Sequence, residues 1–247
     1  MQFKATTKAK TLLDWLRAIN AVADECVFDT SGTDAVTVRV VDPANALLLD
    51  MRMPDHAWDV LDMEQGRFGV DVSVLIDRVK TFDLDADITI SREDGNLVRV
   101  ADSSAWYTVP IIEPDNLRKA PEIPVLDLPA KVIIDAARLQ RMVKRAASVS
   151  DHLRIGLEPV NGYMFVSAKG DASGYEEHAL FDGEVVVLPG HRVAVSSLYS
   201  LDYTEGVAKT TAGDVVIDLG SDLPMLLSFV LHDAIVCYVQ APRVEKD

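Results

Sequence analysis

The sequence predicts an α+β fold in which two similar halves each combine antiparallel strands with two helices. Three observations support this prediction. Short apolar runs bounded by turn residues, which are typical of strands, recur along the whole chain. Each half also contains two segments with apolar residues at helical spacing. Finally, a stretch with four prolines near the middle separates halves that repeat one order of elements. Such a composition favours sheets on one side of a domain and helices on the other.

The first half is expected to begin with a strand at 3–7 and a helix that starts at Thr7 or Lys8 and ends at Ala23. A second helix follows near residue 75. The buried faces of these helices are marked by apolar residues three or four apart, namely Leu12, Trp15, Leu16, Ile19, Val22 and Ala23, and then Val72, Leu75, Ile76, Val79 and Phe82. Further apolar runs predict strands at 26–30, 35–41, 46–53, 58–61, 67–70, 88–92, 97–101 and 106–112. Turn residues at 31–34, a corner at 41–45 and the Asp94-Gly95 step connect them.

The second half repeats this order. A strand at 131–134 precedes Asp135, which is a suitable N-cap for a helix with the apolar stripe Leu139, Met142, Val143 and Ala146. Strands at 153–157 and 164–168 flank an Asn161-Gly162 turn, and the strands 176–181 and 184–188 follow. The segment 193–195 is expected to lead into a fourth helix that carries Leu198, Leu201 and Val207. The last strands are expected at 215–219, 226–231 and 235–240.

We therefore expect two domains, 1–113 and 130–247, joined by a connector at 114–129. A chain of 247 residues is long enough for two domains that each bury a core. The connector is either a plain linker or also a docking segment, because it places apolar residues on an expected surface loop. These residues are Leu117, Ile123, Val125 and Leu126.

Composition excludes several classes of protein. The formal net charge of −15 argues against a sequence-specific nucleic-acid binder, which would usually be basic. Two distant cysteines, Cys26 and Cys237, lie in apolar surroundings and indicate buried thiols in a reducing compartment. No apolar run is long enough to span a bilayer, and the first residues form no signal region. A cytoplasmic protein without a membrane partner is expected.

The chain lacks the residue patterns of common enzymes. There is no phosphate-binding glycine loop, no HExxH, no GxSxG and no cysteine–histidine cluster at metal spacing. The five histidines are scattered at positions 56, 152, 178, 191 and 232. We therefore expect no catalytic residues, no metal and no cofactor. An acidic enzyme with an unrecognised site remains an alternative, and it would need a deep pocket with converging titratable groups.

Basic residues cluster on the expected helices, although the protein is acidic. In the third helix, Arg138, Arg141, Lys144 and Arg145 recur at helical spacing, opposite the apolar stripe. The other helices add Lys10, Arg17, Arg78, Lys80 and Lys209. These bases either solubilise the helices through ion pairs or bind a polyanion by non-specific phosphate contacts. The acidic residues crowd the strands and loops instead, which favours the second interpretation.

Five short segments follow one another in a familiar order: 41–45 (Val-Asp-Pro-Ala-Asn), 149–152 (Val-Ser-Asp-His), 169–171 (Lys-Gly-Asp), 200–203 (Ser-Leu-Asp-Tyr) and 238–245 (Tyr-Val-Gln-Ala-Pro-Arg-Val-Glu). In these segments and in their order, the chain resembles the archaeal branch of the proliferating cell nuclear antigen family, the sliding clamps of DNA replication. The resemblance implies a DNA-clamp fold and a homotrimeric ring, with helices around the central hole and sheets as the outer wall. It also implies a processivity factor for DNA replication and repair that is not an enzyme. Duplex DNA would pass through the hole, and a clamp loader would open the ring.

The resemblance further implies a site for a short peptide motif of DNA polymerase, flap endonuclease and ligase. Carried over by position, the site is expected to use residues of the 41–48 corner, the connector and the tail. These are Val41, Asn45, Ala46, Leu48, Ile123, Val125, Pro224, Val239, Ala241 and Pro242. Apolar walls and open backbone suit an extended peptide with apolar anchors. Leu48 is equally well explained as a core residue.

Subunit contacts in the family pair strand edges head to tail, which closes a ring. The resemblance therefore implies that the strand 106–112 pairs with 175–181 of a neighbour. The interface residues would be Trp106, Tyr107, Val109 and Ile111 on one side, and Tyr175, Glu176, His178 and Leu180 on the other. A subunit of a heterotrimeric or checkpoint-type clamp, which does not close a ring with itself, is the alternative.

The chain departs from the family's pattern at three positions. Val239 stands where many members have a larger aromatic residue or leucine, so a shallower pocket is expected. Asp14 and Asp77 lie on helix faces that the family tends to keep basic. The DNA contact is therefore expected to be weak or concentrated on the third helix.

Overall fold

The computed structural model describes all residues except 1, 33, 94–95, 124, 182 and 244–247. The Asp94-Gly95 step, Thr33, Pro124 and the end of the tail at 244–245 lie outside the described residues. The chain divides into two compact units. The first unit comprises Met1–Asp42, Leu49–Pro121 and Leu231–Val236, and the second comprises Pro43–Leu48, Glu122–Val230 and Cys237–Asp247. The domain boundaries at 113 and 130 stay a prediction.

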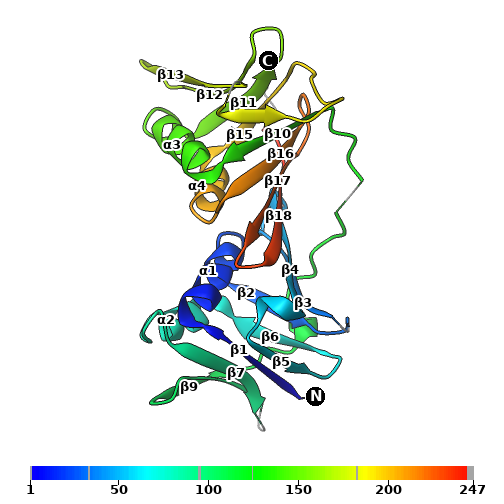
Figure 1. The fold of residues 1–247 in the computed structure, drawn as a ribbon, viewed down its shortest axis with the longest axis vertical. Helices are drawn as coiled ribbons and strands as arrows, with labels where there is room; N and C mark the ends of the chain where they lie inside the picture. Colours follow the sequence, from blue (N-terminus) through cyan, green and yellow to red (C-terminus); the bar gives the residue numbers. More distant parts are fainter. Residues whose placement is uncertain (1, 33, 94–95, 124, 182, 244–247) are drawn as a thin grey trace. The chain divides into compact units, whose positions relative to one another are not determined.

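The first unit contains a five-stranded antiparallel sheet in the order β5-β1-β7-β8-β9 (Figure 1). The bounds of its strands are β1 (Phe3–Lys8), β5 (Val60–Met63), β7 (Asp87–Glu93), β8 (Leu97–Ala101) and β9 (Trp106–Pro110). A second group of strands has the order β4-β3-β2-β6, with bounds β2 (Glu25–Asp29), β3 (Ala35–Val41), β4 (Leu47–Pro54) and β6 (Arg67–Asp71). Residues 47 and 48 of β4 belong to the second unit.

Helices α1 (Ala9–Asn20) and α2 (Val72–Val79) pack against each other. Their buried faces carry the apolar residues that the periodicity predicted, including Leu12, Leu16 and Leu75. Trp15 is 1% exposed, and its Nε1 donates a hydrogen bond of 2.8 Å to the carbonyl of Leu231. Two short 3-10 turns, η1 (Asp55–Ala57) and η2 (Pro114–Asn116), complete the unit.

The second unit contains a four-stranded antiparallel sheet in the order β13-β12-β11-β15. Its strands are β11 (His152–Glu158), β12 (Tyr163–Lys169), β13 (Gly174–Leu180) and β15 (Val195–Ser200). Further strands follow in the order β14-β10-β16-β17-β18, with bounds β10 (Ala130–Asp135), β14 (Val185–Val187), β16 (Asp214–Leu219), β17 (Met225–Leu231) and β18 (Ala234–Gln240). Residues 234–236 of β18 and residue 231 of β17 belong to the first unit. Helices α3 (Ala136–Ala147) and α4 (Leu201–Ala208) pack against each other and against the four-stranded sheet.

The predicted repeat of elements is confirmed at four strand-to-helix junctions. Each helix starts directly after a strand, as β1-α1, β6-α2, β10-α3 and β15-α4. Asp71 and Asp135 occupy the equivalent N-cap positions of α2 and α3, and their carboxylates accept hydrogen bonds from the amides of Val74 and Arg138. A cap of this kind stabilises a helix by about 1 kcal/mol. The N-cap predicted at Asp135 is therefore confirmed.

Several predicted element boundaries are wrong. The first helix ends at Asn20 rather than at Ala23, and the strand predicted at 58–61 lies at Val60–Met63. Leu198 lies in β15, because the segment before Leu201 alternates buried and half-buried residues as a strand does. Thr7 and Lys8 belong to β1 rather than to the first helix. The last strand of the first half ends at Pro110, and Ile112 instead exchanges two 2.9 Å backbone hydrogen bonds with Gly69 of β6. A Cβ at Gly69 would lie 2.5 Å from the Ile112 carbonyl oxygen, so glycine permits this close approach.

Candidate functional site

Among the described residues, no group of three histidine, cysteine, aspartate or glutamate side chains could hold a metal ion. Within the same residues, no helix has the length and apolar character needed to cross a membrane. A hollow of about 570 Å³ lies on the β11-β12-β13-β15 sheet. Two of its lining residues are engaged in local pairs, His152 with Asp151 and Glu176 with His178.

Helix α3 carries its four predicted bases in two different environments. Arg141 and Lys144 are exposed, and within the described part of the chain they form no ion pair or side-chain hydrogen bond. Arg138 is only 16% exposed, whereas Arg145 is 57% exposed, and both contact the carboxylate of Glu177 on β13. The helix therefore offers two free cationic side chains to a polyanion and uses two others to bind its own sheet.

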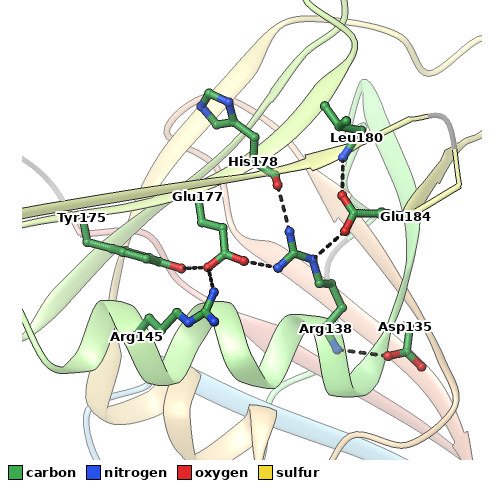
Figure 2. A network of polar contacts seen from close by, with 8 residues as sticks. All are labelled: Asp135, Arg138, Arg145, Tyr175, Glu177, His178, Leu180 and Glu184. Atoms are coloured by element: carbon green, nitrogen blue, oxygen red, sulfur yellow. Dashed lines mark hydrogen bonds and ion pairs between the residues drawn. The ribbon is translucent and has the colours of Figure 1, made fainter.

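Glu177 is the centre of the polar network that Figure 2 shows between α3 and β13. Its side chain is 13% exposed and accepts hydrogen bonds from Arg138, from Arg145 at 2.6 Å and from the Tyr175 hydroxyl at 2.5 Å. Burial alone would raise the pKa of Glu177. The hydrogen bonds from Tyr175 and the two guanidinium groups outweigh burial and lower the pKa to about 2. The carboxylate is thus ionised at neutral pH.

Arg138 extends this network along the edge of β13. Its Nη2 donates a hydrogen bond of 2.9 Å to the carbonyl of His178, and its Nε lies 3.2 Å from Glu184 Oε1. The other carboxylate oxygen of Glu184 accepts a 3.0 Å hydrogen bond from the amide of Leu180. Neither Glu177 nor Glu184 was predicted from the sequence. The only sequence signal for Glu177 is strand alternation, which puts it on the same face as the buried Ala179.

The other helices hold their predicted bases in local pairs. Lys10 and Arg17 of α1 approach Asp14 at 2.6 and 3.7 Å. Burial alone would raise the pKa of Asp14, but hydrogen bonds from Lys10 and His232 lower it below its usual value. In and just after α2, Lys80 pairs with Asp77 at 2.6 Å and Arg78 lies over the ring of Tyr107 at 5.6 Å. At the end of α4, Lys209 pairs with Glu205 at 3.0 Å.

Nine of the ten predicted peptide-site residues belong to the second unit, and Val41 belongs to the first. Two backbone hydrogen bonds hold the tail. The Ala241 amide donates to the Ala46 carbonyl at 2.8 Å, and the Arg243 amide donates to the Leu198 carbonyl at 2.7 Å. The structure therefore brings Ala46 and Ala241 together.

The accessibility of the other predicted peptide-site residues varies. Leu48 is 7% exposed and Val41 is 6% exposed, which makes both of them core residues. Val125 is fully exposed. Asn45 is exposed and adopts a left-handed conformation with φ of 57°. The partly exposed residues are Ala46, Ile123, Pro224, Val239, Ala241 and Pro242.

Both predicted subunit-contact strands lie at sheet edges, β9 in the first unit and β13 in the second. Trp106 on β9 is 58% exposed and Leu180 on β13 is 52% exposed. Val109 is buried, and the amide of Ile111 donates to the Asn96 carbonyl at 2.8 Å. The remaining predicted interface residues lie on the same two strands with partly or largely exposed side chains: Tyr107, Tyr175, Glu176 and His178.

Comparisons with known proteins give a consistent result. No family model matches the chain. It is 33% identical to a protein of Methanothrix thermoacetophila named DNA polymerase sliding clamp, over 99% of both chains. It is 31% identical to a protein of the same name from Halobacterium salinarum, covering 99% of this chain and 100% of the relative. Among solved structures, PCNA of A. fulgidus, bound to the C-terminal region of FEN-1, matches with a TM-score of 0.90 and 27% identity over 99% of this chain and all of that one.

Proposed function

The chain belongs to the DNA polymerase sliding clamp family, and on that basis we propose that it forms a ring around duplex DNA and tethers a DNA polymerase to it. The relationship that carries this proposal extends over 99% of this chain and of its 33% identical relative. The function is mechanical. A ring that encircles DNA stays attached through topology, so its phosphate contacts can be few and exchange rapidly. The protein acts as a processivity factor and not as an enzyme, and a clamp loader opens the ring.

Helix α3 supplies the main contact with DNA in this proposal. Arg141 and Lys144 are exposed and form no ion pair in the described residues, so each can release counterions from a DNA phosphate. The bases of α1, α2 and α4 contribute less, because Lys10, Lys80 and Lys209 are paired with neighbouring carboxylates. The net charge of −15 repels DNA from the rest of the surface.

Subunits assemble into a homotrimer through the two open strand edges. An unpaired edge exposes a row of amide and carbonyl groups, and pairing β9 of one subunit with β13 of the next removes both edges. The contact is head-to-tail and therefore closes into a ring when the rotation per subunit is one third of a turn. The domains of each subunit are 1–113 and 130–247, joined by the connector 114–129.

Polymerase, flap endonuclease and ligase bind through a short peptide in a pocket formed by the connector, the corner and the tail. The backbone hydrogen bond from the Ala241 amide to the Ala46 carbonyl supports this placement, because it joins the tail to the corner, two of the expected walls of the pocket. The partly exposed Ile123, Pro224 and Val239 offer apolar surface, while the buried Leu48 supports the pocket from within the core. The FEN-1 segment bound to the A. fulgidus protein provides a test peptide.

Titration calorimetry with that peptide tests the pocket. Ile123→Asp places a charge in an apolar wall, so we expect a loss of affinity of at least tenfold, which corresponds to about 1.4 kcal/mol. Val160→Asp is the matched control, because Val160 is 95% exposed on a different turn of the same unit. If the Ile123 variant forms an intact trimer and binds the peptide with unchanged affinity, the connector is not part of the peptide site.

A further inference from the structure

The four-stranded sheet of the second unit carries a hollow of about 570 Å³. A volume of this size suits a binding site, because ligand pockets of proteins span about 300–1,000 Å³. All four strands contribute to the lining, which is partly apolar and partly charged. Its charged and larger apolar side chains include His152, Arg154, Lys169, Glu176 and Leu198. The register of the sheet determines which of these side chains lie next to one another.

The hollow lies on the face of the sheet that points away from helix α3. The side chain of Glu177 reaches α3, so its neighbour Glu176 points to the opposite face, because side chains alternate along a strand (Figure 2). Ser167, Arg154 and Leu198 follow in direct register across the sheet and share this outer face. The sheet therefore separates the hollow from the cations of α3 that are proposed to contact DNA.

Three basic side chains meet at one end of this hollow. Lys169 follows Ser167 by two residues on β12, and His152 precedes Arg154 by two residues on β11, so all of them point outward. Extending the observed pairing of Arg154 with Ser167 by two residues places His152 opposite Lys169. Opposed residues have Cβ atoms about 4.5–5.5 Å apart, and diagonal neighbours such as Arg154 and Lys169 are about 7–8 Å apart. Like charges this close repel one another unless an anion lies between them.

The carboxylates around the hollow are engaged with histidines. Glu176 lies 2.8 Å from Nε2 of His178, and Asp151 contacts the ring of His152. Lys169 is exposed and forms no ion pair within the residues that the structure describes. The hollow therefore offers an uncompensated positive charge on a protein whose net charge is −15.

The tail connects this hollow to the proposed peptide site. Ala241, one of the expected walls of that site, bonds Ala46, and two residues later the Arg243 amide donates a 2.7 Å hydrogen bond to the carbonyl of Leu198. Leu198 lines the hollow, and all of these residues belong to the second unit. Arg154 lies one strand beyond Leu198, about 4.8 Å away in backbone distance, which an extended peptide covers in about two residues. A peptide that leaves the site past the tail therefore reaches the hollow directly.

An acidic peptide suits this arrangement better than a nucleic acid. Carboxylates at alternate positions of an extended peptide are about 6.6 Å apart, close to the diagonal spacing of Arg154 and Lys169. A guanidinium group binds a carboxylate with two parallel hydrogen bonds. A polynucleotide carries a charge on every residue, so it would also meet the carboxylates of Glu176 and Asp151 at the rim, which repel it.

We propose that the hollow binds an acidic segment of the partner proteins, beside the short motif that the peptide site binds. This inference rests on the proposed peptide site and adds a second contact that selects partners with carboxylates next to that motif. Arg154 and Lys169 hold these carboxylates, and Leu198 provides apolar surface at the end near the tail. The two bases lie on β11 and β12, so a neighbouring subunit that pairs with the β13 edge leaves them accessible.

Titration calorimetry with extended versions of the FEN-1 segment bound to the A. fulgidus protein tests this site. A short stretch of alternating aspartate and glycine is added to the N-terminal end of one peptide and to the C-terminal end of another, and asparagine replaces aspartate in the matched controls. We expect the aspartate extension at one end to bind the full chain about threefold tighter or more than its control. Lys169→Ala and Arg154→Ala should each reduce this gain. Arg192→Ala should retain it, because Arg192 is exposed in the same unit but does not line the hollow.

The outcomes separate the hollow from the peptide site. If the unextended segment binds and neither aspartate extension adds affinity, the hollow does not bind acidic peptides, although the peptide site stands. If the unextended segment does not bind, both proposals are wrong. A gain that survives Lys169→Ala and Arg154→Ala in folded protein places the aspartates elsewhere and overturns the assignment.

Two further results would identify a different occupant. A gain that appears only in a chain shortened after Arg243 would assign the hollow to the chain's own Glu245 and Asp247 rather than to a partner. Binding of a short single-stranded oligonucleotide that Lys169→Ala abolishes, without any gain from aspartate, would show that the ligand is a nucleic acid. Either result contradicts the proposal. Circular dichroism confirms that each variant is folded, and the exposed Lys169 is the substitution least able to disturb the sheet.

Discussion

Helices α1 and α3 occupy equivalent places in the two units, yet they hold their basic side chains differently. Both follow a strand directly and have 12 residues. In α1, Lys10 and Arg17 converge on Asp14 of the same helix. In α3, Arg138 and Arg145 bind Glu177 of a strand, and Arg141 and Lys144 remain without ion pairs in the described residues. A count of bases therefore overestimates the charge that a helix can offer to DNA.

The largest effect is expected from breaking the α3 network. Glu177→Gln removes the charge that two guanidinium groups share, and Arg138, which is 16% exposed, would keep only Glu184 as an anionic partner. We expect the free energy of unfolding to fall by about 3 kcal/mol. Urea unfolding followed by circular dichroism measures this change. Asp77→Asn, which breaks an exposed pair with Lys80, is the control and should leave the free energy of unfolding almost unchanged.

A loss below about 1 kcal/mol for Glu177→Gln would show that the network adds little to the second unit. Helices α1 and α3 would then differ only in the surface charge that they present.

Acid should weaken the same network. The pKa of Glu177 lies at about 2 in the folded chain and near the ordinary glutamate value when unfolded. Because the folded value is the lower one, this stabilisation is complete above about pH 4.5 and is lost as the pH falls toward 2. Over this pH range, we expect the free energy of unfolding of the wild type to fall by roughly 1–3 kcal/mol more than that of Glu177→Gln. Parallel pH-dependent curves for the two proteins would contradict the assignment.

Much of the fold follows from the sequence because burial imposes regular patterns. The apolar stripe of α3 and the N-cap at Asp135 needed no tertiary information. Leu198 was misplaced because its segment is short, and strand alternation and helical spacing agree over so few residues. The proline-rich stretch indicated a boundary, but it could not show that residues 231–236 join the first unit.

The candidate site was less predictable for a different reason. The basic face of α3 was visible as a pattern, but the roles of its members depend on a strand about 35 residues further along the chain. Helical spacing treats Arg138 and Arg141 alike, whereas only Arg138 reaches Glu177. Pairing between distant residues of this kind has no local periodicity, so it requires the folded structure.

A salt titration of DNA contact distinguishes the two helices directly. Each cation that neutralises a phosphate adds about 1 to the slope of log affinity against log salt. Arg141→Ala with Lys144→Ala should lower the slope by about 2 for each subunit whose helix contacts DNA. Lys10→Ala with Arg17→Ala is the matched control and should lower it by well under 1. Equilibrium binding of the protein to short linear duplex DNA at increasing salt measures both slopes, and equal changes in the two double variants would show that α1 and α3 do not differ in DNA contact.

The smallest effect is expected from making α1 resemble α3. Asp14→Asn removes the carboxylate that Lys10 and Arg17 share, so both become available to phosphate. We expect a rise in the salt slope of less than about 1 per subunit, because both side chains must still find phosphates. The same measurement of binding to short linear DNA applies. An unchanged slope would indicate that α1 lies away from DNA whatever its charge.

The ring is tested most directly by the mass of the purified wild-type protein in solution. Light scattering across salt and protein concentration should show one species of three chains, which dissociates only at low concentration. A monomer under all conditions would contradict a ring that closes with itself, and it would favour a clamp subunit that requires companion chains.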